Sequence, residues 1–146
     1  MTGLELLQAI AAGNAPGAPI AELMGFEPVE AEEGRVLFAA IPGPHHYNPI
    51  GTVHGGLAAT LLDSAMGCAV HTTLPDGVGY TTLELKVNFT RPITSETGRV
   101  LCEGTVVHRG GRVATAEGRV IAERGGKLLA HGTTTCLLMS VNGDPR

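Results

Sequence analysis

The sequence contains no tryptophan, and aromatic residues make up only 3% of its 146 positions. Side chains on which nucleobases could stack are therefore scarce, which argues against single-stranded nucleic-acid binding. Charged residues are also few, at 16%, whereas 43% of the residues belong to the hydrophobic set. Such a composition can fill a core and lacks the charge-rich signature of disorder. The length suits one globular domain.

Cysteine is rare as well. Cys68, Cys102 and Cys136 stand far apart in apolar surroundings, without a short paired spacing. They predict neither a disulfide framework nor a zinc site, and the histidines show no ligand spacing either, so we expect reduced thiols and no metal.

Signals for export and membrane insertion are missing too. Glu5 stands where a secretory signal would carry positive charge, and no window approaches 18 uninterrupted apolar residues. We therefore expect a cytoplasmic protein that has no membrane partner.

Positive charge is nearly absent from the first part of the chain. Residues 1–80 carry eight acids and a single base, Arg35, whereas residues 81–146 carry six acids and nine bases. The net charge of −4 argues against a nucleic-acid partner, but the basic second part could meet a small polyanion.

The first residues predict a helical segment. Thr2 and Glu5 fit a capping box, and apolar residues then recur at helical spacing as far as Gly13. After a short linker, Ile20 to Met24 predict one more helical turn that ends at Gly25.

The remaining pattern predicts an α+β domain in which one sheet curls around one helix. A hairpin is expected from 26–31 and 35–41, and a buried helix from about 54 to 71, where apolar residues occur on all sides. Four antiparallel strands follow at 80–89, 99–108, 112–123 and 127–139, with Gly-Gly turns between the last three. We therefore divide the chain into a helical segment and linker (1–24), a domain (25–140) and a tail (141–146).

Asp63 is the only ionisable carboxylate within the predicted helix, and it has two interpretations. It could mark a solvated face, as charged residues usually do. Its neighbours on the same face, however, are mostly small and apolar, among them Gly56, Ala59 and Gly67. Small residues let a ligand or another backbone approach closely, so Asp63 becomes a candidate general base or nucleophile.

Gly55 and Gly56 directly open the same helix. The first N–H groups of a helix lack internal partners and lie at the positive end of its dipole, so these glycines could donate to a developing oxyanion. The alternative is a simple turn. Gly55 and Asp63 would lie about 12 Å apart along one helix, too far for one catalytic centre. Two copies of the helix would have to share each site, which predicts a symmetric homo-oligomer.

These residues carry a family resemblance. Asn48, His54-Gly55-Gly56 and Asp63 resemble the hotdog-fold acyl-CoA thioesterases, in the PaaI-like, phenylacetate-pathway branch of the 4-hydroxybenzoyl-CoA thioesterase superfamily. The likeness runs from about Gly25 to Met139.

The resemblance implies a hotdog fold, a long central helix wrapped by a curved antiparallel β-sheet, in dimers or dimers of dimers. It implies hydrolysis of an acyl-CoA thioester, with Asp63 as the catalytic acid and the Gly55 N–H as the oxyanion donor. His54 and Asn48 would orient the thioester and the water, and Thr82 would hold a hydroxyl near that water. No cofactor is implied beyond the CoA of the substrate.

The resemblance also implies that the CoA part lies along the basic second part of the chain. The residues concerned are Gly56, Phe89, Arg91, His108, Arg109, Gly110, Gly111 and Arg112. Ordinary surface solubility is the alternative for the arginines.

Two other functions stay open. Hotdog hydratases and dehydratases usually carry a histidine five residues after the acid, where this chain has Cys68. A non-catalytic acyl-CoA-binding module would keep the pocket without turnover. The sequence leaves open the acyl length, the preference for aryl groups and whether Asp63 acts as base or nucleophile. It also leaves open whether the thiol carrier is CoA or a carrier protein.

Overall fold

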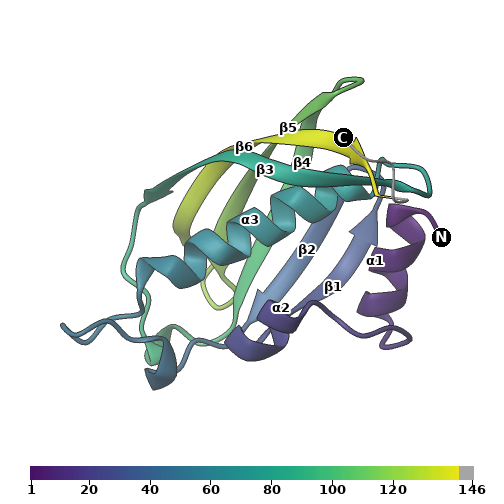
Figure 1. Ribbon diagram of the computed structural model, residues 1–146. Coiled ribbons are helices and arrows are strands. Elements are labelled where there is room, and N and C mark those ends of the chain that lie inside the picture. Colours follow the sequence, from purple (N-terminus) through teal and green to yellow (C-terminus); the bar gives the residue numbers. More distant parts are fainter. Residues whose placement is uncertain (142–146) are drawn as a thin grey trace.

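A computed structural model describes residues 1–141 of the chain and has the predicted α+β plan (Figure 1). In that part of the chain, six strands form one antiparallel sheet that curls around helix α3 (Gly55–His71). The other helices are α1 (Gly3–Ala11) and α2 (Pro19–Met24), with short 3₁₀ turns at Pro44–His46 and Ser95–Thr97. The strands are β1 (Phe26–Glu32), β2 (Arg35–Ala40), β3 (Val78–Phe89), β4 (Val100–Arg109), β5 (Val113–Ala122) and β6 (Leu128–Ser140).

Local signals place most element ends where the sequence predicts them. The Thr2 hydroxyl accepts from the Glu5 N–H, and the Glu5 carboxylate accepts from the Thr2 N–H, so the capping box is confirmed. Helix α2 ends at Gly25, whose φ of 79° is left-handed, and Gly34 (φ 82°) turns the β1–β2 hairpin. The segment between the β1–β2 hairpin and Asn48, for which the sequence predicts no helix or strand, contains one 3₁₀ turn. Of the expected tail, all but Val141 lies outside the described residues.

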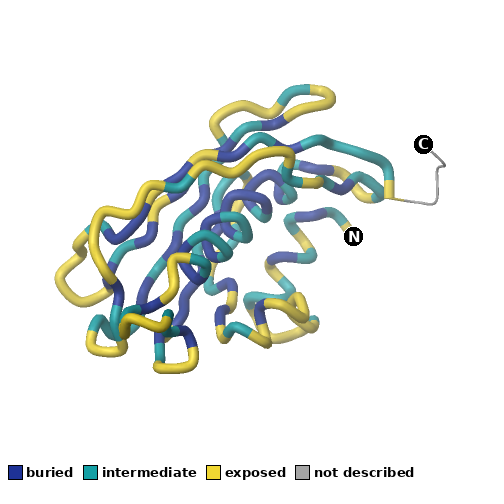
Figure 2. The backbone as a smooth tube through the Cα atoms, turned by 60° about the vertical axis from the view of Figure 1, so that its left-hand side comes forward, coloured by how far each residue is buried: buried dark blue, intermediate teal, exposed yellow. Residues whose placement is uncertain are grey.

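The strand order is β1-β2-β4-β5-β6-β3. The two Gly-Gly turns join β4 to β5 and β5 to β6, as predicted. β3 does not pair with β4, the next strand in sequence, but crosses to the far side and pairs with β6. It therefore forms an edge of the sheet within the described chain, and most of its residues are exposed, as the yellow stretches of the backbone tube in Figure 2 indicate.

A row of three glycines brings α3 onto the middle of the sheet. Gly104, Gly118 and Gly132 are register partners across β4, β5 and β6. A Cβ on Gly104 would overlap the backbone of Ala65 in α3, and one on Gly118 would lie 3.0 Å from the side chains of Leu62 and Met66. The helix therefore lies directly against bare strand backbone.

Helix α3 is the centre of the core. Leu57, Leu61, Leu62 and Met66 are at most 2% exposed, so the predicted burial is confirmed (Figure 2). Leu61 and Met66 belong to the core and are covered completely by the sheet and its neighbours. No helix among residues 1–141 is both long and apolar enough to cross a bilayer.

A β-bulge at Leu83 changes which of the following β3 residues point toward α3. Thr82 pairs with Cys136 and Glu84 with Thr135, so β3 advances two residues while β6 advances one. Residues seven apart normally point to opposite faces of a strand. The extra residue puts Thr82 and Phe89 on the same face, and both contact α3.

Candidate active site

Asp63 lies near the middle of α3 and is partly buried. Its Oδ1 accepts a hydrogen bond of 2.7 Å from the Thr82 hydroxyl of β3. Met66, Gly67 and Val70 on the same side of the helix are buried, which argues against a freely solvated face. The structure thus brings together two of the predicted site residues, 19 positions apart in sequence.

The His54-Gly55-Gly56 motif caps α3. The Nδ1 atom of His54 accepts from the Gly56 N–H at 2.8 Å, so the ring proton of a neutral imidazole is on Nε2. The Gly56 N–H is therefore already used. The Gly55 N–H makes no hydrogen bond to any residue in the described part of the chain, and it is the first N–H of the helix. Of the two predicted oxyanion donors, only Gly55 has a free N–H.

A pocket of about 320 Å³ adjoins this helix end and joins four of the predicted residues. His54 and Gly55 line it from α3, whereas Phe89 and Arg91 line it from the end of β3 and the segment that follows. A Cβ on Gly55 would lie 3.1 Å from the Phe89 ring, so glycine lets the ring pack against the helix start. We call this cavity the β3 pocket.

Asn48 organises the loop before α3. Its Oδ1 accepts from the N–H groups of Ile50 and Thr52, and its Nδ2 donates to the Thr52 hydroxyl at 2.9 Å. Its amide holds the 48–52 loop, and within the described chain its side-chain hydrogen bonds all go to that loop rather than to Asp63 or Gly55. The predicted role of Asn48 toward a thioester stays a prediction.

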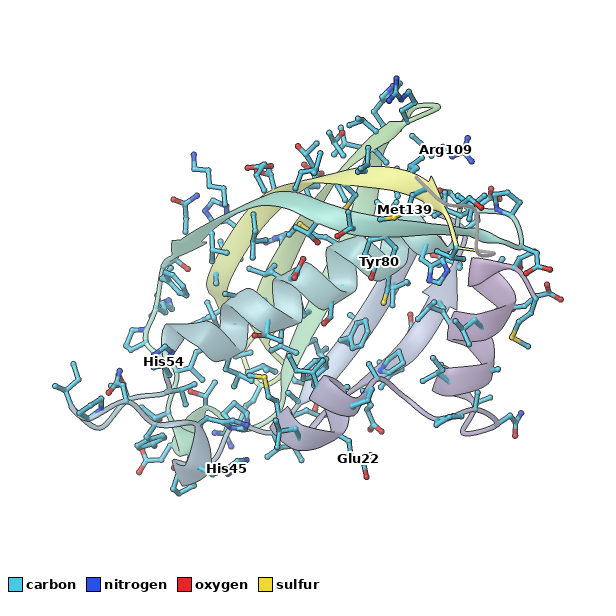
Figure 3. All side chains as sticks on the ribbon, viewed as in Figure 1. Glu22, His45, His54, Tyr80, Arg109 and Met139 are labelled. Carbon is cyan, nitrogen blue, oxygen red and sulfur yellow. The ribbon has the colours of Figure 1, made fainter. Side chains whose placement is uncertain are left out.

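The Arg109–Arg112 hairpin is not near the β3 pocket of the same chain. Val113 pairs with Leu137 on β6, whereas Phe89 pairs with Ala130, seven residues along that strand and about 23 Å away. Figure 3 shows Arg109 and His54 at opposite ends of the molecule. His108, Arg109 and Arg112 are exposed, and Gly110 and Gly111 form the turn between them.

Tyr80 is a neighbour of the candidate site that the sequence did not single out, and Cys68 lies beside it. Tyr80 packs on Gly67, where a Cβ would collide with its ring, and its labelled side chain lies against α3 in Figure 3. Burial raises the pKa of Tyr80, and it raises the pKa of the Cys68 thiol to about 12. Gly67, one turn beyond Asp63, was the available signal for this close contact.

Metal ligands are not clustered in the described chain: no group of three or more His, Cys, Asp or Glu side chains there could hold an ion. All three cysteines are free thiols, Cys102 and Cys136 buried and Cys68 partly buried.

Comparison with known proteins identifies the class. The sheet wrapped around one long helix is the hotdog fold, and the profile of the Thioesterase superfamily matches residues 50–129, more than half of the chain. The chain belongs to the Thioesterase superfamily. The resemblance to the hotdog thioesterases, stated from the motif, and the predicted hotdog fold are both confirmed.

Individual relatives agree with this placement. The phenylacetic acid degradation protein PaaI from Thermus thermophilus, solved as a mutant, is 30% identical, with a TM-score of 0.74 over 82% of this chain and 98% of that one. A phenylacetic acid degradation-related protein from Ralstonia eutropha is 28% identical, with a TM-score of 0.79 over 90% and 98%.

A curated relative is more similar over a shorter stretch. A proposed esterase from Halobacterium salinarum is 41% identical over 73 residues, which are 49% of this chain. The match spans 46% of the length of that relative.

Proposed function

We propose that the chain hydrolyses acyl-CoA thioesters to a free carboxylic acid and CoA, at sites shared between two copies. The observation that carries the proposal is the hydrogen bond from Thr82 to Asp63, which fixes a carboxylate within an otherwise apolar helix. A fixed carboxylate can take a proton from water or attack a carbonyl carbon itself.

In the first route, the Asp63 carboxylate accepts a proton while the water oxygen bonds to the thioester carbon. The carbonyl electron pair moves onto oxygen, where the free Gly55 N–H donates to the oxyanion. The C–S bond then breaks, the electron pair returns, and the CoA thiolate leaves and takes up a proton. In the second route, an Asp63 carboxylate oxygen bonds to the thioester carbon, the C–S bond breaks and CoA leaves as the thiolate. Water then hydrolyses the mixed anhydride to the free acid and the Asp63 carboxylate, and the released proton goes to the thiolate.

The geometry favours two copies. Gly55 and Asp63 are separated by eight positions of α3, about 12 Å, so one carbonyl cannot meet both groups of one helix. β3 is an unpaired edge of the described sheet and exposes Leu83 (56%), Leu85 (36%) and Phe89 (58%). A long apolar edge favours strand pairing with a second chain, which would place two α3 helices side by side.

Hydration of an enoyl thioester is disfavoured by Cys68. This residue occupies the position where hydratases carry a histidine, and burial raises the pKa of its thiol to about 12. A thiol that stays protonated cannot serve as the base.

The test is thiol release from short, medium, long and aryl acyl-CoAs by the wild type and by Asp63→Asn. We expect hydrolysis by the wild type and a loss of about 10²- to 10⁴-fold in the variant, with unchanged folding. Asp76→Asn is the matched control, because Asp76 is an exposed acid beyond the end of α3.

Full activity of Asp63→Asn would overturn the role of that residue. Tight binding of acyl-CoA without turnover by the wild type would indicate a binding module instead. An active monomer in sedimentation analysis would overturn the shared site.

A further inference from the structure

A second cavity, of about 630 Å³, opens on the other side of the His54-Gly55-Gly56 motif. α2 contributes Leu23 and Met24, the 3₁₀ turn is followed by Tyr47, and α3 contributes Leu57 and Thr60. We call it the α2 cavity. Its size lies within the usual range for small-molecule sites.

The α2 cavity and the β3 pocket meet at His54, which lines both. Gly55 lines the β3 pocket and Gly56 lines the α2 cavity, so the free N–H of Gly55 lies where the two adjoin. A thioester whose carbonyl oxygen accepts from this N–H would extend one substituent into each space.

The two spaces differ in charge. Arg91 lines the β3 pocket, whereas the α2 cavity is lined by no lysine, arginine, aspartate or glutamate. Its aliphatic wall consists of Leu23, Met24 and Leu57. The phosphate-bearing arm of CoA therefore suits the β3 pocket, and an uncharged group suits the α2 cavity.

Most polar groups around the α2 cavity are already paired. The Nδ1 of His46 accepts from the Gly43 N–H, and its Nε2 donates to the Met24 carbonyl at 2.7 Å. The Thr60 hydroxyl donates to the Gly56 carbonyl, and the Tyr47 hydroxyl pairs with Ser95.

The other two histidines that line the α2 cavity are His54 and His45. His54 uses Nδ1 for its cap, and His45 stacks on His46 at the exposed rim, with the ring centroids 3.8 Å apart. The interior therefore holds no cation that could receive a terminal carboxylate.

We propose that the α2 cavity binds the acyl group of the substrate and selects uncharged acyl groups larger than acetyl. This inference rests on the proposed function. Thr60, which faces the cavity from α3 one turn before Asp63, sets the acyl size that fits.

The experiment compares kcat/KM for acetyl-, hexanoyl-, benzoyl- and glutaryl-CoA in the wild type, Thr60→Met and Thr73→Met. Thr73 is a matched control because its hydroxyl also donates to a helix carbonyl, that of Val70, but at the other end of α3. Folding of each variant is checked by thermal unfolding.

We expect the wild type to prefer hexanoyl- and benzoyl-CoA to acetyl-CoA and to hydrolyse glutaryl-CoA poorly, although its acyl chain is nearly as long as hexanoyl. Thr60→Met fills the cavity, so the ratio of hexanoyl to acetyl activity should fall about tenfold, whereas Thr73→Met keeps the wild-type ratio.

An unchanged ratio in a folded Thr60→Met variant would overturn the inference, as would equal use of glutaryl- and hexanoyl-CoA by the wild type. Absence of hydrolysis for every thioester would contradict the proposed function instead. Calorimetric binding of hexanoyl-CoA to the same variants would then decide the acyl assignment separately, because Thr60→Met should still weaken binding and Thr73→Met should not.

Discussion

The Thr82 hydroxyl donates to Asp63 Oδ1 at 2.7 Å, which joins the edge strand β3 to the middle of α3. This bond orients one carboxylate oxygen and leaves the other for chemistry. Because β3 is an edge of the described sheet, the same strand that fixes the acid also borders the space in which a second copy would pack.

Removal of the Thr82 hydroxyl should weaken catalysis more than folding. A hydrogen bond to a charged group contributes about 1.5–3 kcal/mol, so Thr82→Ala should lower kcat by about 10- to 100-fold if the bond orients the reacting carboxylate. Thr82→Ser keeps the hydroxyl and should retain most activity. Steady-state kinetics with hexanoyl-CoA measure both, and equal activities of the two variants would contradict this role.

The contact between Gly55 and Phe89 predicts a coupled pair. A Cβ at position 55 would lie 3.1 Å from the Phe89 ring, so Gly55→Ala should push the ring into the β3 pocket and raise KM. In a Phe89→Ala background the added methyl group meets no ring and should have little further effect. A double-mutant cycle on KM tests this, and additive effects would show that the two residues act independently.

Deletion of Leu83 should leave the inner face of β3 intact, because it removes the residue that is extra relative to β6. Thr82 and Phe89 would then be six positions apart, a spacing that puts both on one face of a regular strand, and the residues after 83 would keep their partners on β6. Deletion of Lys86, which is paired in the regular ladder, should instead reverse the faces on one side of it, so that Val87 and Phe89 would no longer share the α3 side with Thr82. We expect thermal unfolding and hydrolysis assays to show a much larger loss for the Lys86 deletion than for the Leu83 deletion. Equal losses in the two variants would contradict this view of the bulge.

His71 makes stability depend on pH. Burial at the end of α3 lowers its pKa below the ordinary value of 6.5, so the folded state favours the neutral ring. The unfolded state binds a proton first as the pH falls, and the contribution of His71 is therefore full above about pH 6.5 and is lost below it.

Urea unfolding at about pH 7.5 and about pH 5.5 measures this loss. We expect His71→Gln to lose less stability between the two values than the wild type, because the variant has no ring to protonate. His131→Gln, at an exposed position, should keep the wild-type dependence. Equal losses in all three proteins would contradict the assignment to His71.

Sequence patterns predicted the elements because their causes are local. The capping box at Thr2 and Glu5, the left-handed glycine after α2 and the apolar residues all around α3 each depend on residues near one another in sequence. The same holds for the His54 cap and the helix start at Gly55, and the acid was recognised because it interrupts an apolar helix.

The parts that could not be predicted depend on residues distant in sequence. Nothing local to β3 shows that it pairs with β6 rather than β4, and the bulge at Leu83 becomes visible only against its partner strand. For the same reason the family resemblance alone named Thr82, as a hydroxyl near the water, and its bond to Asp63 was not predicted. The separation of Arg109 from the β3 pocket likewise depends on the sheet register.

The glycine row at 104, 118 and 132 sets the distance between the sheet and α3, and with it the reach of the Thr82 hydroxyl to Asp63. A methyl group on the middle strand would have to lift the helix or displace Leu62 and Met66. The absence of Cβ atoms at these three positions, and not only the side chains that line the site, thus determines where α3 holds Asp63. Substitutions at these glycines, which do not belong to the site themselves, can therefore change the geometry of Asp63.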